Sequence, residues 1–358
     1  MYLARTKHLA IKNRYSMNLF TRGVLVLFLF ITITAKAQDI HYSQYYLSPL
    51  TLNPALTGDM DGTYRVGAIY RNQYGSVTIP YVTPSVFADF ALFKGGKSKS
   101  FLGIGFLVLN DQAGDGDLEN TTLMYSMAYH QALDEDGFWH LSIGLQGGYV
   151  FKTVNISALT FPQSWNSNTN QFDLPPGEYN LVGSDSYPDF AAGIAINGSP
   201  SRYSLFTAGV GVFHVTTPTE TFMGSSNTIG MKYIGHVSGT IGVHNKLYIF
   251  PSALFIDQSP NMEFTAGSSF GINFSQQNGV IGTIFYIGAY DRVTGNDAII
   301  PTIGFIIHGL QVGFAYDVNT STLQAASGGQ GAYEIGLIYT GNIKVHKPDQ
   351  KYYCPHFY

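Results

Sequence analysis

The stretch Leu310-Gln311-Val312-Gly313-Phe314-Ala315-Tyr316-Asp317 decides the fold class of this chain. Apolar side chains stand at every second position, with small or polar residues between them. This period predicts a β-strand with one apolar face and one polar face. In a soluble sandwich the apolar face points into the core, whereas in a transmembrane barrel it points to lipid and the polar face lines the lumen.

The same alternation recurs along the chain after residue 38. It predicts fourteen strands, and bacterial single-chain barrels have an even number. Several are close to the length of about 9–11 residues that a tilted strand needs to cross a bilayer. The predicted strands are 63–71, 83–93, 101–110, 120–132, 139–151, 187–197, 203–212, 231–243, 247–256, 263–273, 280–290, 300–307, 310–317 and 331–340.

The links between these strands alternate in length. Those after odd-numbered strands are mostly long, at 72–82, 111–119, 152–186, 213–230, 257–262, 291–299 and 318–330. Those after even-numbered strands are mostly short, at 94–100, 133–138, 198–202, 244–246, 274–279 and 308–309. Outer-membrane barrels have long extracellular loops and short periplasmic turns. We therefore expect this orientation, with the N-terminus of the barrel in the periplasm.

Composition favours the membrane barrel over the soluble sandwich. Charged residues make up 12% of the 358 residues, about half the share in soluble globular proteins. There are 40 Gly, 25 Tyr and 25 Phe. A helical membrane protein would gather its apolar residues into blocks of about 20, and here they are spread evenly. The fold class is thus predicted to be all-β, a transmembrane antiparallel β-barrel of about 14 strands.

The N-terminus carries the pattern of an export signal. A basic flank precedes the apolar run 24–33, and Ala35-Lys36-Ala37 follows as a small-x-small cleavage pattern. The alternative is a transmembrane anchor, for which the run is too short. We predict a signal peptide at 1–37, a periplasmic N-terminal segment at 38–62, the outer-membrane barrel at 63–340 and a C-terminal periplasmic tail at 341–358.

Charge and cysteine content exclude several partners. Residues 1–37 hold six of the 19 basic residues and none of the 23 acidic ones, so the mature chain carries a net charge of −10. A nucleic-acid partner requires a basic footprint, so none is expected. The single Cys354 excludes an internal disulfide framework and a cysteine zinc site.

Nothing in the sequence resembles a catalytic constellation, and no cofactor or metal is expected. His236 and His244 share the lumenal face of one predicted strand, but no carboxylate is near them in sequence. The loop around Asp111, Asp115 and Asp117 lacks the final glutamate of a calcium loop. The glycine pairs at 103–105 and 209–211 lie inside strands, so a lumenal face explains them better than a dinucleotide loop.

Charges on the lumenal faces form the candidate site. Arg65 and Arg71 share one face of the first predicted strand, and Asp317 and Glu334 lie on the polar faces of the last two. A closed barrel places its first strand beside its last, and charges in a narrow lumen are commonly paired. We interpret these four residues as a candidate lumen charge network. A substrate site is the alternative interpretation.

Several short motifs follow one another in a specific order. The mature chain opens with Gln38-Asp-Ile-His-Tyr-Ser-Gln-Tyr-Tyr and continues with Leu52-Asn53-Pro54-Ala55-Leu56-Thr57-Gly58 and Tyr70-Arg71-Asn72-Gln73-Tyr74. Later come Gly288-Ala289-Tyr290-Asp291-Arg292, Tyr316-Asp317-Val-Asn-Thr-Ser321 and Gly331-Ala332-Tyr333-Glu334-Ile335. Together these motifs resemble the PorP/SprF family of Bacteroidota outer-membrane proteins. The family-motif loop residues are Asn53, Pro54, Gly58, Asn72, Gln73, Asp291, Arg292 and Ser321.

The resemblance implies a non-enzymatic role in the type IX secretion system and the gliding-motility machinery. The expected partners are outer-membrane lipid, secretion-system components and an exported surface protein. The barrel would support secretion and surface attachment of adhesin-like proteins. A passive channel or uptake porin is the first alternative. A barrel hydrolase is the second, although no Ser/His/Asp set can be assembled from the sequence.

Overall fold

The computed structural model describes residues 39–343, apart from residues 95–98, 115, 157–158, 160, 175–182, 202–203, 223–224, 245, 275, 278–279 and 282. The predicted signal peptide, at 1–37, and residues 344–358 of the predicted tail lie outside the described residues. Among the residues that are described, no helix is long and apolar enough to span a membrane.

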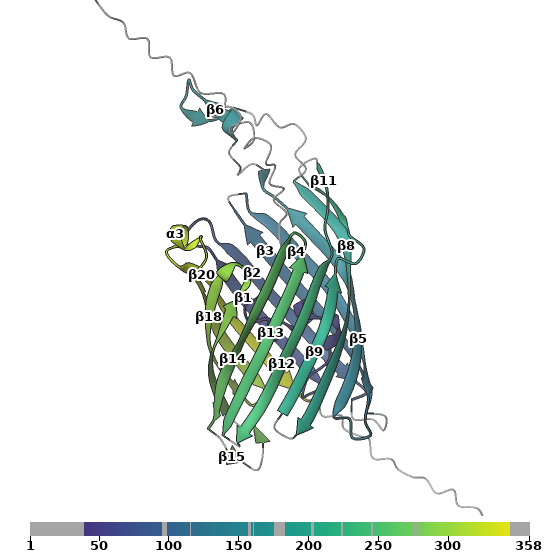
Figure 1. Ribbon diagram of the computed structural model, residues 1–358. Coiled ribbons are helices and arrows are strands. Elements are labelled where there is room, and N and C mark those ends of the chain that lie inside the picture. The colour runs from purple at the N-terminus through teal and green to yellow at the C-terminus, as the bar shows by residue number, and fades with distance from the viewer. Residues whose placement is uncertain are drawn as a thin grey trace, which may run out of the picture. The chain divides into compact units, whose positions relative to one another are not determined.

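Fourteen antiparallel strands form one closed barrel, which confirms the predicted fold class and strand number (Figure 1). Each strand pairs with the next, and β1 closes the barrel against β20, with Arg71 opposite Glu334. Closure leaves no free sheet edge. In order the strands are β1 (Tyr64–Gln73), β2 (Tyr81–Leu92), β3 (Phe101–Ala113), β4 (Leu118–Ala132), β5 (Trp139–Thr153), β8 (Ser184–Ser201), β9 (Ser204–Phe213), β12 (Lys232–His244), β13 (Leu247–Gln258), β14 (Asn261–Asn273), β17 (Thr283–Arg292), β18 (Ala298–Ile307), β19 (Leu310–Asn319) and β20 (Gln330–Gly341).

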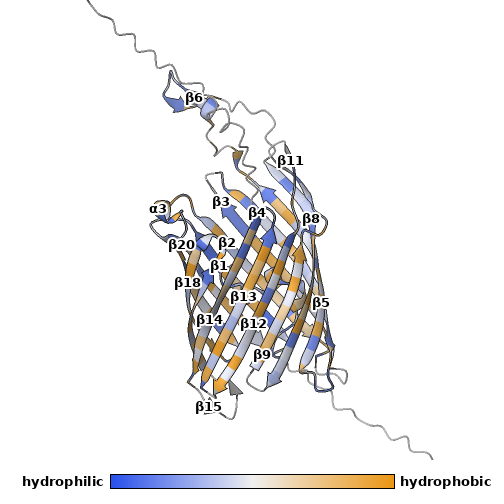
Figure 2. Cartoon of the chain, viewed as in Figure 1, coloured by the Kyte–Doolittle hydropathy of each residue, from blue (hydrophilic) through white to orange (hydrophobic). Residues whose placement is uncertain are grey.

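Exposure alternates along the strands because successive side chains point to opposite faces. In β18, Ile299 and Ile303 are 49% and 40% exposed on the outside, whereas Ile300 and Thr302 are 0% and 2% exposed on the inside. Figure 2 shows apolar residues distributed along the strands of the wall. An apolar exterior around a partly polar interior is the arrangement of a membrane barrel.

The links sort by length less strictly than the sequence predicts. The three longest, 154–183, 214–231 and 320–329, all follow odd-numbered strands of the barrel. The links 114–117 and 259–260 also follow odd-numbered strands, yet they are short, since the flanking strands extend beyond their predicted ends. We call the end of the barrel with the three longest links the long-link end, and the opposite end the short-link end.

Within the described parts of the links, three small hairpins form. They are β6 (Trp165–Asn166) with β7 (Gln171–Phe172), β10 (Thr219–Phe222) with β11 (Ser225–Thr228), and β15 (Gln276–Gln277) with β16 (Val280–Ile281). Short helical turns are η4 (Pro162–Ser164), η5 (Thr294–Asn296) and α3 (Gln324–Ser327).

Residues 39–58, which we call the internal segment, lie inside the barrel (purple in Figure 1). They form the short turns η1 (Tyr45–Leu47), α2 (Pro49–Leu52) and η2 (Pro54–Leu56). Asp39 contacts His214 and Lys232 at the long-link end, and Gly58 lies beside Asp89 and Gly103 of the wall toward the short-link end.

This position differs from the separate periplasmic segment expected at 38–62. The reason is physical: short helical turns have no sequence period, so nothing local in 39–58 indicates what covers them. Their apolar side chains are nevertheless buried, with Leu47, Leu50 and Ala55 all 0% exposed. The segment therefore supplies a core to a barrel that would otherwise enclose water.

Candidate functional site

Glycines on the wall allow the internal segment to lie against the strands. A Cβ atom on Gly103 of β3 would stand 1.8 Å from the carbonyl oxygen of Thr57, and one on Gly193 of β8 would stand 1.9 Å from the Asn53 Oδ1 atom. Both distances are far inside van der Waals contact. At Gly105, Gly209 and Gly211, which the sequence singles out together with Gly103, an added Cβ atom would also lie within 3.3 Å of the internal segment.

A buried charge cluster holds Ser43 and Gln44 of the internal segment. Arg71 of β1 pairs with Asp317 of β19, with Nη2 and Oδ2 3.0 Å apart, and also with Glu334 of β20. Arg292 of β17 joins from the other side, with Nη2 3.1 Å from the same Oδ2 of Asp317. All four side chains are buried. Buried charges need both an opposite charge and hydrogen bonds, and the segment supplies part of that set.

Ser43 of the internal segment lies at the centre of this cluster. Its hydroxyl donates to Asp317 Oδ1 at 2.7 Å, and its backbone N–H donates to Glu334 Oε1 at 2.6 Å. The N–H of Gln44 donates to the other Glu334 oxygen at 2.8 Å. Arg71 and Arg292 each donate to the Ser43 hydroxyl oxygen, at 2.9 and 3.0 Å. The cluster thus binds the backbone N–H groups of Ser43 and Gln44 and the Ser43 hydroxyl.

Three of the four predicted network residues meet here, and the fourth does not. Arg65 lies toward the short-link end and pairs with Asp89 of β2, with Nη2 and Oδ2 2.7 Å apart. Arg65 also donates to the carbonyl oxygens of Leu56 and Asp59, both at 3.1 Å. The N–H of Gly58 donates to Asp89 at 2.7 Å. Arg65 therefore belongs to a second anchoring site, which holds the end of the segment.

A third anchoring site holds the start of the segment at the long-link end. Asp39 pairs with Lys232 at 2.9 Å and with His214, whose Nδ1 lies 2.9 Å from Asp189. Burial alone would raise the pKa of Asp39, but Lys232 and His214 hold it well below its ordinary value. Burial would lower the pKa of His214, but the two carboxylates raise it to about 9. His214 is therefore a cation at neutral pH.

The histidine weighed as a metal ligand has a structural partner. His236 of β12 lies with its Nε2 3.0 Å from the Asn53 side-chain nitrogen. The side chain of His244 and the residue Asp115 lie outside the described residues, and Asp111 accepts a hydrogen bond from Thr83 at 2.5 Å. Within the described part of the chain, no group of three or more His, Cys, Asp or Glu could hold a metal ion.

The motif residues expected in loops are distributed differently. Asn53, Pro54 and Gly58 belong to the internal segment, and Ser321 lies in the link 320–329. Asn72 and Gln73 end strand β1, and Asp291 and Arg292 end strand β17, so the expectation that these four are loop residues is wrong. The opening motif and Arg292 meet at Ser43. The sequence alone does not show that Arg292, Asp89, Ser43 and Asp189 contact charged partners in the lumen, because those partners are remote in the chain.

These features define a class of protein: a membrane β-barrel whose lumen is occupied by its own N-terminal segment. The family of type IX secretion system membrane proteins PorP/SprF matches residues 34–339. The chain therefore belongs to this family. A search of curated proteins finds no match. The family and the fold are those of a secretion-system barrel and not of an enzyme class.

Solved barrels show only a distant likeness. The toluene transporter TbuX of Ralstonia pickettii has a TM-score of 0.46 and 11% identity, over 80% of this chain and 90% of that one. The toluene transporter TodX of P. putida has a TM-score of 0.40 and 10% identity, over 82% and 93%. The KdgM porin has a TM-score of 0.36 and 7% identity, over 77% and 98%. At these scores the likeness carries no argument about function.

Proposed function

We propose that this chain is a non-enzymatic outer-membrane component of the type IX secretion system that supports secretion and surface attachment of an exported adhesin-like protein. The observation that carries the proposal is the family match over residues 34–339. The links at the long-link end would hold the exported partner, and the other end or the tail 341–358 would contact the secretion apparatus. Outer-membrane lipid surrounds the wall.

The internal segment supports this role over that of a passive channel or uptake porin. An open porin has a water-filled lumen, whereas here residues 39–58 lie in the lumen and are fixed at three places along its length. We infer a scaffold that binds protein partners. The channel alternative predicts a stable open pore with solute selectivity when the purified protein is added to planar bilayers.

A gene deletion tests the proposal. In the deletion strain, one particular large exported protein should disappear from the cell surface, and a plasmid copy of the gene should restore it. Surface proteomics of intact cells measures the change, and bulk secretion of other type IX substrates is the control. Unchanged display of every candidate substrate would contradict the proposed role.

A further inference from the structure

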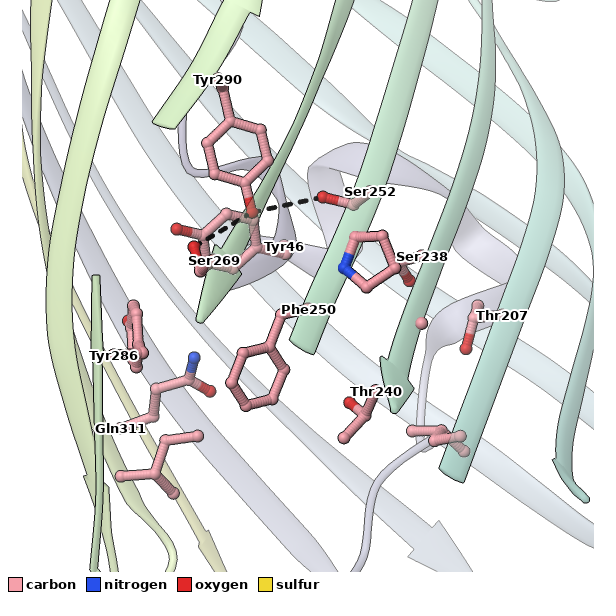
Figure 3. A pocket seen from close by; sticks show the side chains of 14 residues that line it. Tyr46, Thr207, Ser238, Thr240, Phe250, Ser252, Ser269, Tyr286, Tyr290 and Gln311 are labelled. Carbon is pink, nitrogen blue, oxygen red and sulfur yellow. Dashed lines mark hydrogen bonds between the residues drawn. The ribbon is translucent and has the colours of Figure 1, made fainter. Parts of the chain in front are cut away.

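A cavity of about 280 Å³ lies inside the barrel, between the internal segment and one side of the wall (Figure 3). Its inner end is formed by Tyr46 of the segment and Tyr290 of β17. Its outer end includes Leu205, Ile306 and Gln311, each within two residues of a strand terminus at the short-link end. The cavity therefore opens toward the short-link end and stops at the segment.

One wall of the cavity is a row of hydroxyl groups. Thr207 of β9 stands directly opposite Ser238 of β12, and Ser238 stands directly opposite Ser252 of β13. Thr240 lies two positions further along β12 on the same face. Figure 3 shows these side chains on one side of Phe250, with Tyr286 and Gln311 on the other. Three neighbouring strands thus present hydroxyls at one level.

Several of these hydroxyls have no protein partner. Within the described residues, those of Thr207, Ser238 and Thr240 make no hydrogen bond, and that of Tyr46 is buried without a partner. Ser252 differs, because it accepts from Tyr45 at 2.9 Å. A buried polar group without a partner costs free energy. The Tyr46 hydroxyl is closed off from the cavity. The hydroxyls of Thr207, Ser238 and Thr240 line the cavity and are not closed off, so a ligand there can pair with them.

The remaining lining is uncharged and includes the aromatic rings of Tyr46, Phe250, Tyr286 and Tyr290. Phe250 and Tyr286 make an edge-to-face pair with ring centroids 6.1 Å apart, and Tyr46 stacks on Tyr290 at 6.0 Å. No charged residue is among the described residues that line the cavity. A phosphate, a carboxylate or an ammonium group would therefore lose its water shell here without a counter-charge.

We propose that this cavity binds a small neutral saccharide of one or two rings. Each Ser, Thr or Tyr hydroxyl both donates and accepts, as do the hydroxyls of a sugar, and the aromatic rings pack against its C–H faces. A peptide backbone would have no free strand edge to pair with in a closed barrel. The volume is just below the range of about 300–1,000 Å³ for ligand pockets, which limits the ligand's size. This site is independent of the proposed role in secretion.

Titration calorimetry on the full-length protein in detergent tests the proposal. The probes are maltose, cellobiose and N,N′-diacetylchitobiose, with glucuronic acid as an anionic probe. At least one neutral probe should bind saturably. Phe250→Ala, and separately the pair Ser238→Ala with Thr240→Val, should weaken that binding by about tenfold, the effect of losing one packed ring or one to two hydrogen bonds.

Ser268→Ala is the matched control, because Ser268 of β14 does not line the cavity. Its binding should equal that of the unchanged protein, and heat-modifiable migration on gels should show that every variant keeps its barrel. The proposal is overturned if no neutral probe binds saturably, if glucuronic acid binds as tightly, or if a neutral Ser/Gly/Tyr peptide binds more tightly. It is also overturned if Ser268→Ala weakens binding as much as the cavity variants.

Discussion

At the scale of single residues, Arg71 is the most consequential side chain in the lumen. It contacts two carboxylates and the Ser43 hydroxyl while only 3% exposed. Removing one partner of a buried ion pair costs about 3–5 kcal/mol, because the other charge stays buried and unpaired. Arg71→Met should lower the free energy of unfolding by about that amount, measured by urea unfolding in micelles.

A double variant separates this charge effect from a loss of packing. Adding Glu334→Gln to Arg71→Met removes the uncompensated carboxylate, so part of the lost stability should return. If the two substitutions instead destabilise additively, the pair does not stabilise the cluster in the way that its geometry indicates.

Gly103 offers a steric test of the contact between wall and segment. Gly103→Ala places a Cβ atom where the Thr57 carbonyl oxygen lies, at 1.8 Å. Overpacking of this kind costs about 1–3 kcal/mol, and thermal unfolding should show the loss. Gly235→Ala is the matched control, since a Cβ there would meet only Phe255 at 4.0 Å. Equal effects of the two substitutions would contradict the tight fit.

At the anchoring site of the long-link end, the attachment of the internal segment should depend on pH. The pKa of His214 is raised from 6.5 to about 9, so its charge stabilises the folded state fully below 6.5, and this contribution is lost as pH rises through about 9. Asp39, Asp189 and Lys232 are the charged groups that face it. The pKa of Asp39 is lowered, so its contribution is lost only in acid.

Cysteine labelling measures the release of the start of the internal segment from this anchoring site. In an Ile40→Cys, Cys354→Ser protein, labelling of residue 40 should accelerate between pH 7 and pH 10, after correction for thiol ionisation with a free peptide of the same sequence. In a His214→Gln protein, labelling of residue 40 should be fast at every pH, so the acceleration between pH 7 and pH 10 should disappear. Labelling that is slow at all pH values in both proteins would be the contrary result.

At the scale of elements, the strands could be predicted from the sequence and the internal segment could not. All fourteen strands appear near their predicted positions, because the apolar exterior imposes a period of two on every wall strand. Boundaries drift where strands leave the apolar band: β8 runs over Ser184–Ser201, whereas 187–197 was predicted. Polar strand ends keep their backbone pairing and lose the alternation of hydropathy.

The lumen site could be predicted only in part, because some of its contacts follow from the barrel topology and others depend on the strand register. Closure of β1 on β20 follows from barrel topology, and it brings Arg71 to Asp317 and Glu334. The partner of Arg65 on β2 required the register, which no local pattern gives. The internal segment contacts strands from both halves of the chain, and only the inward-facing glycines hinted that something lies against them.

The segment as a whole makes its own prediction. Deleting residues 39–58 removes the apolar core of the lumen and the backbone donors of Glu334. The barrel should then conduct ions in planar bilayers, whereas the unchanged protein should not. Deleting residues 165–172, a hairpin in the link 154–183, is the control and should leave the conductance at the wild-type level. A non-conducting deletion protein that still shows heat-modifiable migration would mean that other residues close the lumen.

At the scale of the whole molecule, the internal segment separates the two ends of the described chain. Asp39 lies with His214 and Lys232 at the long-link end, whereas Gly341 ends β20 at the short-link end and pairs with Tyr64. The chain thus passes through the lumen once before its first strand begins. Asp39 and Gly341 therefore lie at opposite ends of the barrel.

Epitope tags test this threading. One tag is placed between Gln38 and Asp39 and another after Tyr358, in otherwise identical proteins. If the long links face outward, as in outer-membrane barrels, antibody should bind the first tag on intact cells and the second only after permeabilisation. The reverse pair of results would invert the orientation but keep the threading. Both tags on the same face would contradict it, because a segment fixed at Asp39, Ser43 and Gly58 cannot return to the end from which the first strand starts.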